Sequence, residues 1–486
     1  MRVNYRVNAT PVFRVLSDDQ IEEIYHGALE VLERTGARIY QDEALKLLRE
    51  AGAVVEDGNL VHIPSWLVKA GLAATPERIV VVGRNGKHKI VLEKDKIYFG
   101  TGSDCPNVID PYTDERRPFT YKDIYNGATI SDALPNVDFH MSIGLTSDVP
   151  IPTYDRHQFL AMLEGCTKPF IITAVDAEGL ADQYEMACTV LGGEEEFAKN
   201  PLFVVYIEPS SPLSHSKEAV DKLLYCAEKG IPAIYAPCPI AGGTGPTTLA
   251  GLLVQGLAEC LVGIVIAQLK RKGTPIIIGG VVSIMDMKAT VLAYGAPELS
   301  LLSAAFTEIA KWLRLPMFST AGCSDAKVLD QQAAIEAAIS IAVAALSGAN
   351  LIHDVGYMES GLVGSYDMLV MSDEIISMAK RIMRGITVDE ESLALEVIDR
   401  VGPGGHYLED EHTLKHYRTE FWFPSLIDRR RWEDWEAGGR KTMAQRVREK
   451  VIDLIENYEP EPIPEDVHAK LKAIVAAADE RHPEEE

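Results

Sequence analysis

The chain has 486 residues and a formal net charge of −25, from 47 basic and 72 acidic side chains. Its acidic character argues against a nucleic-acid-binding surface. No apolar run of about 20 residues is free of polar side chains, and the N-terminus has no signal-peptide core. These features exclude a nucleic-acid-binding or membrane-spanning protein from the expected classes.

The seven cysteines are dispersed and form no C-x-x-C pair. An odd, scattered set in a large chain is typical of reduced thiols. We therefore predict a cytoplasmic protein without a disulfide framework.

Residues 1–95 predict a small N-terminal α/β extension. Ser17 has the position of a helix cap before an amphipathic segment, and a second helix is predicted over 43–51. Hairpins are expected around Asp57-Gly58 and around Asn85-Gly86. We expect this region to cover one end of the domain that follows.

Residues 96–388 carry eight short apolar runs, each ending in polar, glycine, aromatic or acidic residues. The runs begin at Lys96, Asn136, Pro169, Pro201, Ile231, Thr274, Leu315 and Ala349. A helix-like segment follows each of the first seven runs, and another follows the last. Eight βα units predict a closed (β/α)₈ (TIM) barrel, in which functional residues sit on the loops after the strands.

Helix boundaries are predicted from capping signals between these runs. Thr120 and Asp123 resemble a capping box, and Pro246 and Pro297 are expected in the first turns of the fifth and sixth helices. A further helix is predicted over 330–346, and the last is expected to begin near Ser372.

Residues 389–486 differ in character and predict a C-terminal helical arm. Aromatic side chains lie beside arginines over 417–435. Such residues anchor interfaces, so the segment packs on the barrel, on another subunit of a homo-oligomer or on a protein partner.

The loop after the fifth run, IAGGTGP, contains Gly242, Gly243 and Gly245. Backbone N–H groups of a glycine loop before a helix favour an anion, such as a carboxylate or a phosphate. The spacing matches neither the Walker pattern nor G-x-G-x-x-G, so a tight βα turn is the alternative.

The last run, LIHDVGYMESG, supplies titratable residues at a strand end. His353 and Asp354 are adjacent, so in an extended strand only one of them faces the barrel mouth. A pair formed by His353 and Glu359 is a candidate for acid–base work or for attraction of a cation.

Aromatic residues recur near the other strand ends. A quaternary ammonium has no N–H to donate, so it is held by aromatic faces with an acid nearby. The candidate residues are Tyr98, Phe99, Tyr206, Tyr235, Phe318 and Tyr357, with Glu208 or Glu359 as the acid. The alternative is that several of these aromatic rings fill the barrel core.

A catalytic zinc site is a second possibility. Its ligands would come from Cys105, Cys238, Cys323, His140 and His353, which fall near strand ends. No local spacing among them supports a metal site, so we predict none.

Five segments resemble the trimethylamine methyltransferase (MttB-like) superfamily. They are IAGGTGP, AGCSDAK, LIHDVGYMESG, FGTGSD and LSDDQIEEIYHGALEVLERTGARIY, in the family's order and over nearly the whole chain. The resemblance implies a (β/α)₈ barrel that moves a methyl group from a methylated amine to the cobalt of a separate corrinoid protein.

In that superfamily the trimethylamine enzymes carry pyrrolysine, whereas this chain has only standard residues. It therefore resembles the members without pyrrolysine, such as glycine betaine methyltransferases. The expected substrate is glycine betaine or a related betaine, its ammonium held by the aromatic residues and its carboxylate by His353 and the Gly242–Gly245 loop. No tightly bound cofactor is expected, because the partner carries the corrinoid.

Two further hypotheses remain open from sequence. One is a zinc-dependent methyltransferase for a thiol or an alcohol. The other is a betaine-binding protein that catalyses no reaction. Within the family, tetrahydrofolate is a second possible methyl acceptor.

Overall fold

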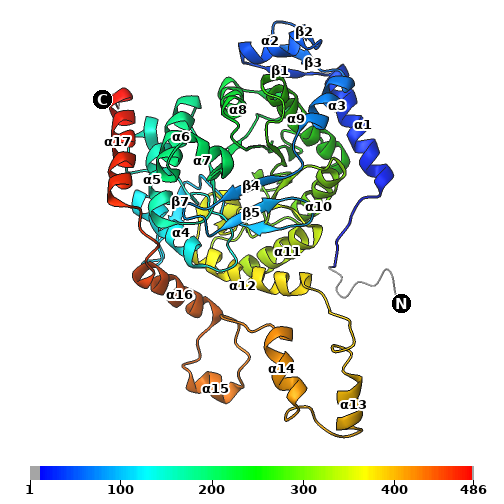
Figure 1. Ribbon diagram of the computed structural model, residues 1–486, viewed down its shortest axis with the longest axis vertical. Helices are drawn as coiled ribbons and strands as arrows, with labels where there is room; N and C mark the ends of the chain where they lie inside the picture. Colours follow the sequence, from blue (N-terminus) through cyan, green and yellow to red (C-terminus); the bar gives the residue numbers. More distant parts are fainter. Residues whose placement is uncertain (1–10, 484–486) are drawn as a thin grey trace.

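The computed structural model describes residues 11–483, in which eight parallel segments form a ring. Helices surround this ring (Figure 1). Seven of them form one parallel sheet in the order β6-β18-β17-β14-β12-β10-β9. These strands are β6 (Tyr98–Phe99), β9 (Phe170–Ile172), β10 (Phe203–Ile207), β12 (Ala233–Tyr235), β14 (Ile276–Gly279), β17 (Met317–Thr320) and β18 (Leu351–His353).

The eighth segment closes the ring. Phe139 pairs in parallel with Gly100, next to β6, and His140 pairs in parallel with Phe170 of β9. All eight predicted runs therefore lie in the barrel, and the predicted (β/α)₈ fold is confirmed.

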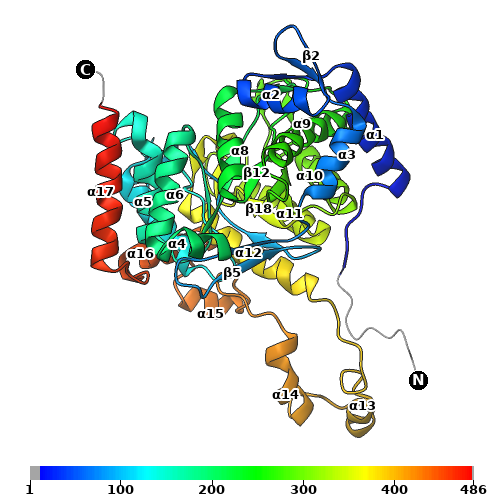
Figure 2. The ribbon, with the colours of Figure 1, turned by 45° about the horizontal axis from the view of Figure 1, so that its top comes forward.

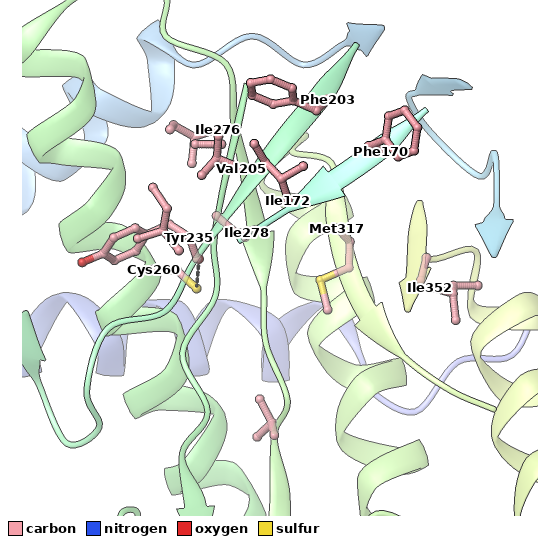
Figure 3. Packing of buried hydrophobic residues seen from close by; sticks show 14 of the residues in the cluster. Phe170, Ile172, Phe203, Val205, Tyr235, Cys260, Ile276, Ile278, Met317 and Ile352 are labelled. Carbon is pink, nitrogen blue, oxygen red and sulfur yellow. Dashed lines mark hydrogen bonds between the residues drawn. The ribbon is translucent and has the colours of Figure 1, made fainter. Parts of the chain in front are cut away.

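Side chains alternate between the inside of the barrel and the layer under the helices, as the two-residue repeat of a strand requires. The interior cluster contains Phe139, Ile171, Val204, Ile234, Ile277, Phe318 and Leu351. Their strand neighbours belong to the large outer cluster, and Figure 3 labels ten side chains of that cluster. Each strand therefore has one face in each core.

A hairpin forms the floor of the barrel. Strands β4 (Ile79–Val82) and β5 (Lys89–Leu92) lie across one end (Figure 1), and four of their side chains join the interior cluster. The floor is on the N-terminal side of the strands, because Val82 N donates to Pro201 O, just before β10. Of the N-terminal region, this hairpin covers one end of the barrel, and the opposite end is the mouth.

Helices surround the strands. They are α4 (Tyr121–Ala133), α5 (Tyr154–Gly165), α6 (Ala177–Leu191), α7 (Glu194–Lys199), α8 (Lys217–Lys229), α9 (Leu249–Lys270), α10 (Pro297–Trp312), α11 (Gln331–Ser347) and α12 (Tyr366–Met383). The capping box of Thr120 and Asp123 and the start at Pro297 are confirmed. Among residues 11–483, α9 alone is long and apolar enough to cross a membrane, but most of it is buried in the protein.

Two helix starts were predicted wrongly. Helix α9 begins at Leu249, after Pro246, because the glycine segment closes on itself as a turn. Helix α12 begins at Tyr366, more than one helical turn before Ser372. It starts there because Ser365 accepts a hydrogen bond from Met368 N and acts as the cap.

Short strands build the mouth. They are β7 (Asn107–Ile109), β8 (Arg116–Pro118), β13 (Ile240–Ala241), β15 (Ser283–Asp286), β16 (Val291–Leu292), β19 (Tyr357–Met358) and β20 (Val363–Gly364). The 3₁₀ turns Ile151–Thr153 and Glu359–Gly361 complete the loops, and Asp325 ties three of them together. It accepts hydrogen bonds from Tyr294 N, Gly295 N and Ser360 Oγ at 2.9 Å each.

The rest of the N-terminal region packs on the barrel flank (Figure 2). It contains α1 (Asp18–Arg34), β1 (Ala37–Ile39), α2 (Asp42–Glu50), β2 (Val54–Glu56), β3 (Leu60–His62) and α3 (Ser65–Ala74), with β11 (Ser214–His215) pairing to β1. Ser17 caps α1 in a capping box with Gln20, as predicted from the sequence.

The C-terminal region has two parts. Helices α16 (Met443–Asn457) and α17 (Glu465–Arg481) pack against α4, α5, α6 and α12. Before them, α13 (Leu395–Val401), α14 (Glu411–Glu420) and α15 (Trp432–Ala437) extend away from the barrel (Figure 1) and contain no buried residue. We call residues 385–441 the arm.

The floor hairpin should contribute measurably to stability. Leu92 is fully buried, so Leu92→Ala leaves a cavity and should lower the free energy of unfolding by about 2 to 5 kcal/mol in urea titrations. Exposed Lys89 on the same strand is the control, and Lys89→Ala should change it by less than about 0.5 kcal/mol. Equal effects of both substitutions would contradict the floor role of the hairpin.

Candidate functional site at the barrel mouth

Three aromatic rings line the barrel interior below the mouth. The rings of Phe318 and His353 are stacked with centroids 3.9 Å apart. The Tyr206 ring lies 5.5 Å from Phe318 and 6.3 Å from His353. Phe318 and His353 are buried and Tyr206 is half-buried, so Tyr206 is the ring of this group that faces solvent.

His353 and Asp354 form a pair whose protonation follows from its partners. His353 Nδ1 lies 2.8 Å from Ser319 O, which can only accept, so Nδ1 carries the proton. Burial lowers the pKa of His353 to about 3, so the ring is neutral and Nε2 is an acceptor. Nε2 faces Asp354 Oδ1 at 3.3 Å. Burial raises the pKa of Asp354 well above its usual range, so Asp354 is the donor and the pair is neutral.

Both residues of this pair reach the mouth, contrary to the expectation from strand alternation. Asp354 has a φ of +71°, in the left-handed region, so the chain turns directly after His353. The carboxyl group of Asp354 therefore lies on the same side as His353, whereas a continued strand would have pointed it outward. The extended-chain argument was wrong here because it assumed that β18 continues through Asp354.

The polar groups around Asp354 leave one of its carboxyl oxygens without a hydrogen bond. The nearby Tyr294 hydroxyl opposes the rise in the pKa of Asp354. Oδ2 has no hydrogen-bond partner in the described part of the chain, although the residue is only 2% exposed. Gly102 makes room for this arrangement, since a Cβ there would lie 2.2 Å from Asp354 Oδ1.

Tyrosine side chains surround Asp354. The Tyr294 and Tyr357 rings meet edge to face with centroids 6.2 Å apart. The Tyr357 hydroxyl donates to Ser103 O, and burial raises the pKa of both phenols well above their usual range. These rings therefore remain neutral aromatic surfaces at neutral pH.

Glu208 and Asp104 bring negative charge to the same mouth. Glu208 is exposed, and its Oε2 accepts a hydrogen bond from the Tyr206 hydroxyl at 2.7 Å. Desolvation raises the pKa of Glu208, and Asp104 and Glu259 raise it further, while Tyr206 and Lys222 oppose the rise. Asp104 likewise has a raised pKa through burial.

Lys222 is the cation that acts on both of these acids. Its Nζ donates to Ala174 O at 2.7 Å. Burial lowers the pKa of Lys222, and the nearby carboxylates of Asp104, Asp155 and Asp176 oppose that change. The positive charge of Lys222 is therefore already compensated by several acids.

Three predicted aromatic residues lie away from the mouth. The Tyr98 hydroxyl accepts from Val91 N of β5, so Tyr98 meets the floor hairpin. Phe99 is fully buried in the outer layer. Tyr235 also faces outward (Figure 3), stacked on His215 at 5.8 Å with its hydroxyl 2.7 Å from Nδ1. Of the predicted rings, Tyr206 and Phe318 contact His353, and Tyr357 lies near Asp354.

The glycine loop does not offer its N–H groups to a ligand. Gly242 N donates to Gly245 O, and Gly243 N and Gly245 N donate to Ile240 O, as does Thr244 N. Gly242 has a φ of +85°, which its lack of a side chain permits. The loop is therefore the tight turn that the sequence left as an alternative.

Glu359 does not pair with His353. Its Oε2 accepts from Arg116 Nε at 2.9 Å. It lines a cavity of about 1070 Å³ that lies between the mouth loops and α16, together with Arg116, Lys327 and Arg448. The predicted His353–Glu359 pair is thus replaced by His353–Asp354.

The zinc hypothesis lacks ligands. Within residues 11–483, no group of three or more His, Cys, Asp or Glu side chains is placed to hold a metal ion. His140 faces the outer layer, with Nδ1 2.9 Å from Ser131 Oγ. Burial raises the pKa values of Cys105, Cys238 and Cys323, and nearby Asp354 raises them further, so these thiols stay protonated.

Sequence reasoning missed Asp104 and Tyr294 and set Asp354 aside. Asp104 ends the FGTGSD segment, directly after the first strand, and its place was a usable signal. Tyr294 lies 15 residues after Gly279, the end of β14, behind the β15–β16 hairpin, so its distance in sequence hid it. The arrangement as a whole can enclose a cation between aromatic rings and carboxylates, without a nucleophile–base pair.

The family model for trimethylamine methyltransferase (MTTB) matches residues 1–483 of the chain. A trimethylamine methyltransferase MttB of Desulfitobacterium hafniense (strain DSM 10664 / DCB-2) is 35% identical and covers 96% of this chain and 94% of its own length. A glycine betaine methyltransferase of D. hafniense (strain Y51) is 32% identical, over 96% and 97%.

Among solved structures, the Methanosarcina barkeri monomethylamine methyltransferase (MtmB) superposes with a TM-score of 0.51 at 13% identity. The match covers 93% of this chain and 89% of that one. At this identity the likeness concerns the fold, and it agrees with the barrel described above.

His353 should remain uncharged over the whole neutral range. Nitrogen-15 NMR of labelled protein should show an Nδ1–H tautomer whose shifts stay constant between about pH 5 and 8, because the lowered pKa lies below that window. The signal is assigned by its loss in His353→Gln. A titration centred near the ordinary value of about 6.5 would contradict the buried neutral pair.

Proposed function

Because the chain belongs to the trimethylamine methyltransferase family, we propose that it transfers a methyl group from a quaternary ammonium compound to the cobalt of a separate corrinoid protein. The observation that carries the proposal is the set of neutral tyrosine rings and carboxyl groups at the barrel mouth. A betaine such as glycine betaine is the substrate expected from the sequence, and one relative is named for it.

The aromatic and acidic residues support the ammonium end of such a substrate. A quaternary ammonium cannot donate hydrogen bonds, so it is held by ring faces and by the field of nearby carboxylates. Tyr206, Tyr294 and Tyr357 supply the rings, and Glu208 supplies an exposed carboxylate beside Tyr206. The neutral His353–Asp354 pair fixes the base of the site through the stack on Phe318.

In this reaction the side chains need only hold the substrate in position. A reduced corrinoid supplies a cobalt nucleophile, and the C–N bond electrons leave with nitrogen as a neutral tertiary amine. No proton has to be moved, so a general acid or base is not required. Holding the N-methyl group in line with the acceptor is the protein's contribution, and positioning alone lowers barriers substantially.

The rim of the mouth supports docking of a protein that carries the acceptor. Exposed apolar side chains stand on three neighbouring loops: Met287 is 75%, Val328 62% and Leu362 48% exposed. Asp325 joins these loops into one surface. Rim-exposed apolar groups around a site are typical of interaction surfaces. An exposed apolar rim favours a protein-borne acceptor over free tetrahydrofolate.

The same proposal includes a cytoplasmic homo-oligomer. The seven cysteines are all unpaired, as in a reducing compartment. The arm exposes large apolar side chains, among them Ile386, Leu395, Leu408, Leu414, Phe421 and Trp432. Helix α11 exposes Ile335 and Ile339 on its outer face. Two unpartnered apolar surfaces on one chain favour contact between copies.

Methyl transfer should depend on Glu208 and not on Glu359. Glu208→Gln removes the exposed carboxylate beside Tyr206 and should lower kcat/KM by about tenfold or more, measured spectroscopically with the reduced corrinoid protein. Glu359→Gln is the matched control, since that carboxylate pairs with Arg116 outside the barrel interior. A larger loss in Glu359→Gln than in Glu208→Gln would contradict the assignment, and binding without any transfer would favour a binding protein.

The arm should set the oligomeric state. Replacing Leu395, Leu408 and Trp432 together by Glu places charges on its apolar surface and should convert the protein to the mass of one chain in analytical ultracentrifugation. The unchanged far-ultraviolet circular dichroism of the variant serves as the folding control. An oligomer that survives the triple substitution would show that the arm is not the contact.

A further inference from the structure

We infer that the substrate is a quaternary ammonium compound of net positive charge that lacks a carboxylate, such as choline or tetramethylammonium, and that betaines are disfavoured. The inference rests on the proposed function and names the substrate class of the same site. It comes from what the mouth offers to each end of a candidate substrate.

The mouth offers acceptors and negative charge. Glu208 is exposed beside Tyr206, and Asp104 is close enough to raise the pKa of Glu208. An independent observation points to a ligand. Asp354 Oδ2 is buried and has no hydrogen-bond partner, although the Tyr294 and Tyr357 rings surround that residue. An orphan acceptor of this kind is costly unless a ligand satisfies it.

The lysine, the histidine and the loop N–H groups considered above for a substrate carboxylate are already used. Lys222 Nζ donates to Ala174 O and lies in the field of Asp104, Asp155 and Asp176. His353 is neutral, with Nδ1 on Ser319 O and Nε2 on Asp354. The N–H groups of Gly242, Gly243 and Gly245 donate within their own turn.

Glycine betaine would place its two ends in one environment. A single methylene separates its ammonium from its carboxylate, so an ammonium held at Glu208 carries the carboxylate into the same negative field. Like charges at close range oppose binding, and the opposition is strong where water is limited. The two ends of a betaine therefore act against each other at this site.

Choline has the complementary groups. Its trimethylammonium fits the tyrosine rings and Glu208, and its hydroxyl is a donor for Asp354 Oδ2. In the transfer step a methyl C–N bond breaks, the electron pair stays on nitrogen, and dimethylaminoethanol leaves as a neutral amine. The cobalt of the proposed partner provides the electron pair for the new bond to the methyl carbon.

The test compares four compounds on one preparation with one corrinoid protein. Binding is measured by calorimetry and methyl transfer by spectroscopy for choline, tetramethylammonium, glycine betaine and carnitine. We expect choline and tetramethylammonium to exceed both carboxylates by about tenfold or more in affinity and in kcat/KM. Glycine betaine or carnitine performing equally well or better overturns the inference but leaves the proposed function intact.

The other outcomes separate the two claims. Tighter binding of choline with no transfer of methyl groups supports the charge selection and overturns the proposed reaction. Failure of all four compounds to bind overturns both.

Two variants sharpen the comparison. Glu208→Gln should narrow the ratio of choline to glycine betaine affinity, because it removes the charge that separates them. Lys222→Gln tests the alternative that this lysine holds the carboxylate of a betaine. A selective loss of glycine betaine binding in Lys222→Gln, with choline unchanged, overturns the inference.

Discussion

Carboxyl groups held at the barrel mouth without matching cations are the constraint on which the site depends. Charge in a desolvated position is unfavourable unless it is paired. Glu208 has a phenol hydroxyl and the field of Lys222, and Asp354 has a neutral imidazole and a phenol. Desolvation is the main cause of the raised pKa of both acids. Under the proposal above, a cationic substrate would stabilise the ionised form of Glu208, so the feature that disfavours the empty site would also select the ligand.

The barrel fold was predictable from sequence because it depends on repetition. Eight apolar runs at regular intervals need only be recognised as strands, and each of them lies in the ring. The site was less predictable because it depends on which way each side chain points. A strand-end aromatic such as Tyr235 faces the helices, whereas Tyr206 two positions before Glu208 faces the interior, and composition does not distinguish them.

Two local departures from regular structure explain the other differences between the predicted and the observed site. The positive φ of Asp354 turns a residue that alternation assigns to the outside into the partner of His353. The Gly242–Gly245 segment uses its own carbonyls as acceptors, which removes the anion site that its composition suggested. Both departures are local, but neither has a sequence signal as strong as a capping box.

The barrel places the proposed substrate-binding residues inside the mouth and the proposed docking surface on its rim. The floor hairpin closes one end of the barrel, so the proposed substrate and acceptor would share the mouth. The rings and acids lie within it, and the exposed apolar residues stand on its rim. Such a division fits a protein that aims a methyl group and leaves the nucleophile to a partner. It also explains how ordinary side chains suffice for the role.

Recognition of positive charge is the central claim, and one measurement addresses it directly. The affinity of choline can be compared by calorimetry with that of 3,3-dimethylbutan-1-ol, which has the same shape and hydroxyl but a carbon in place of the charged nitrogen. The account predicts that choline binds at least about tenfold more tightly, because rings and carboxylates act on its charge. Equal affinity of the two compounds would mean that the mouth selects shape alone and would contradict the account.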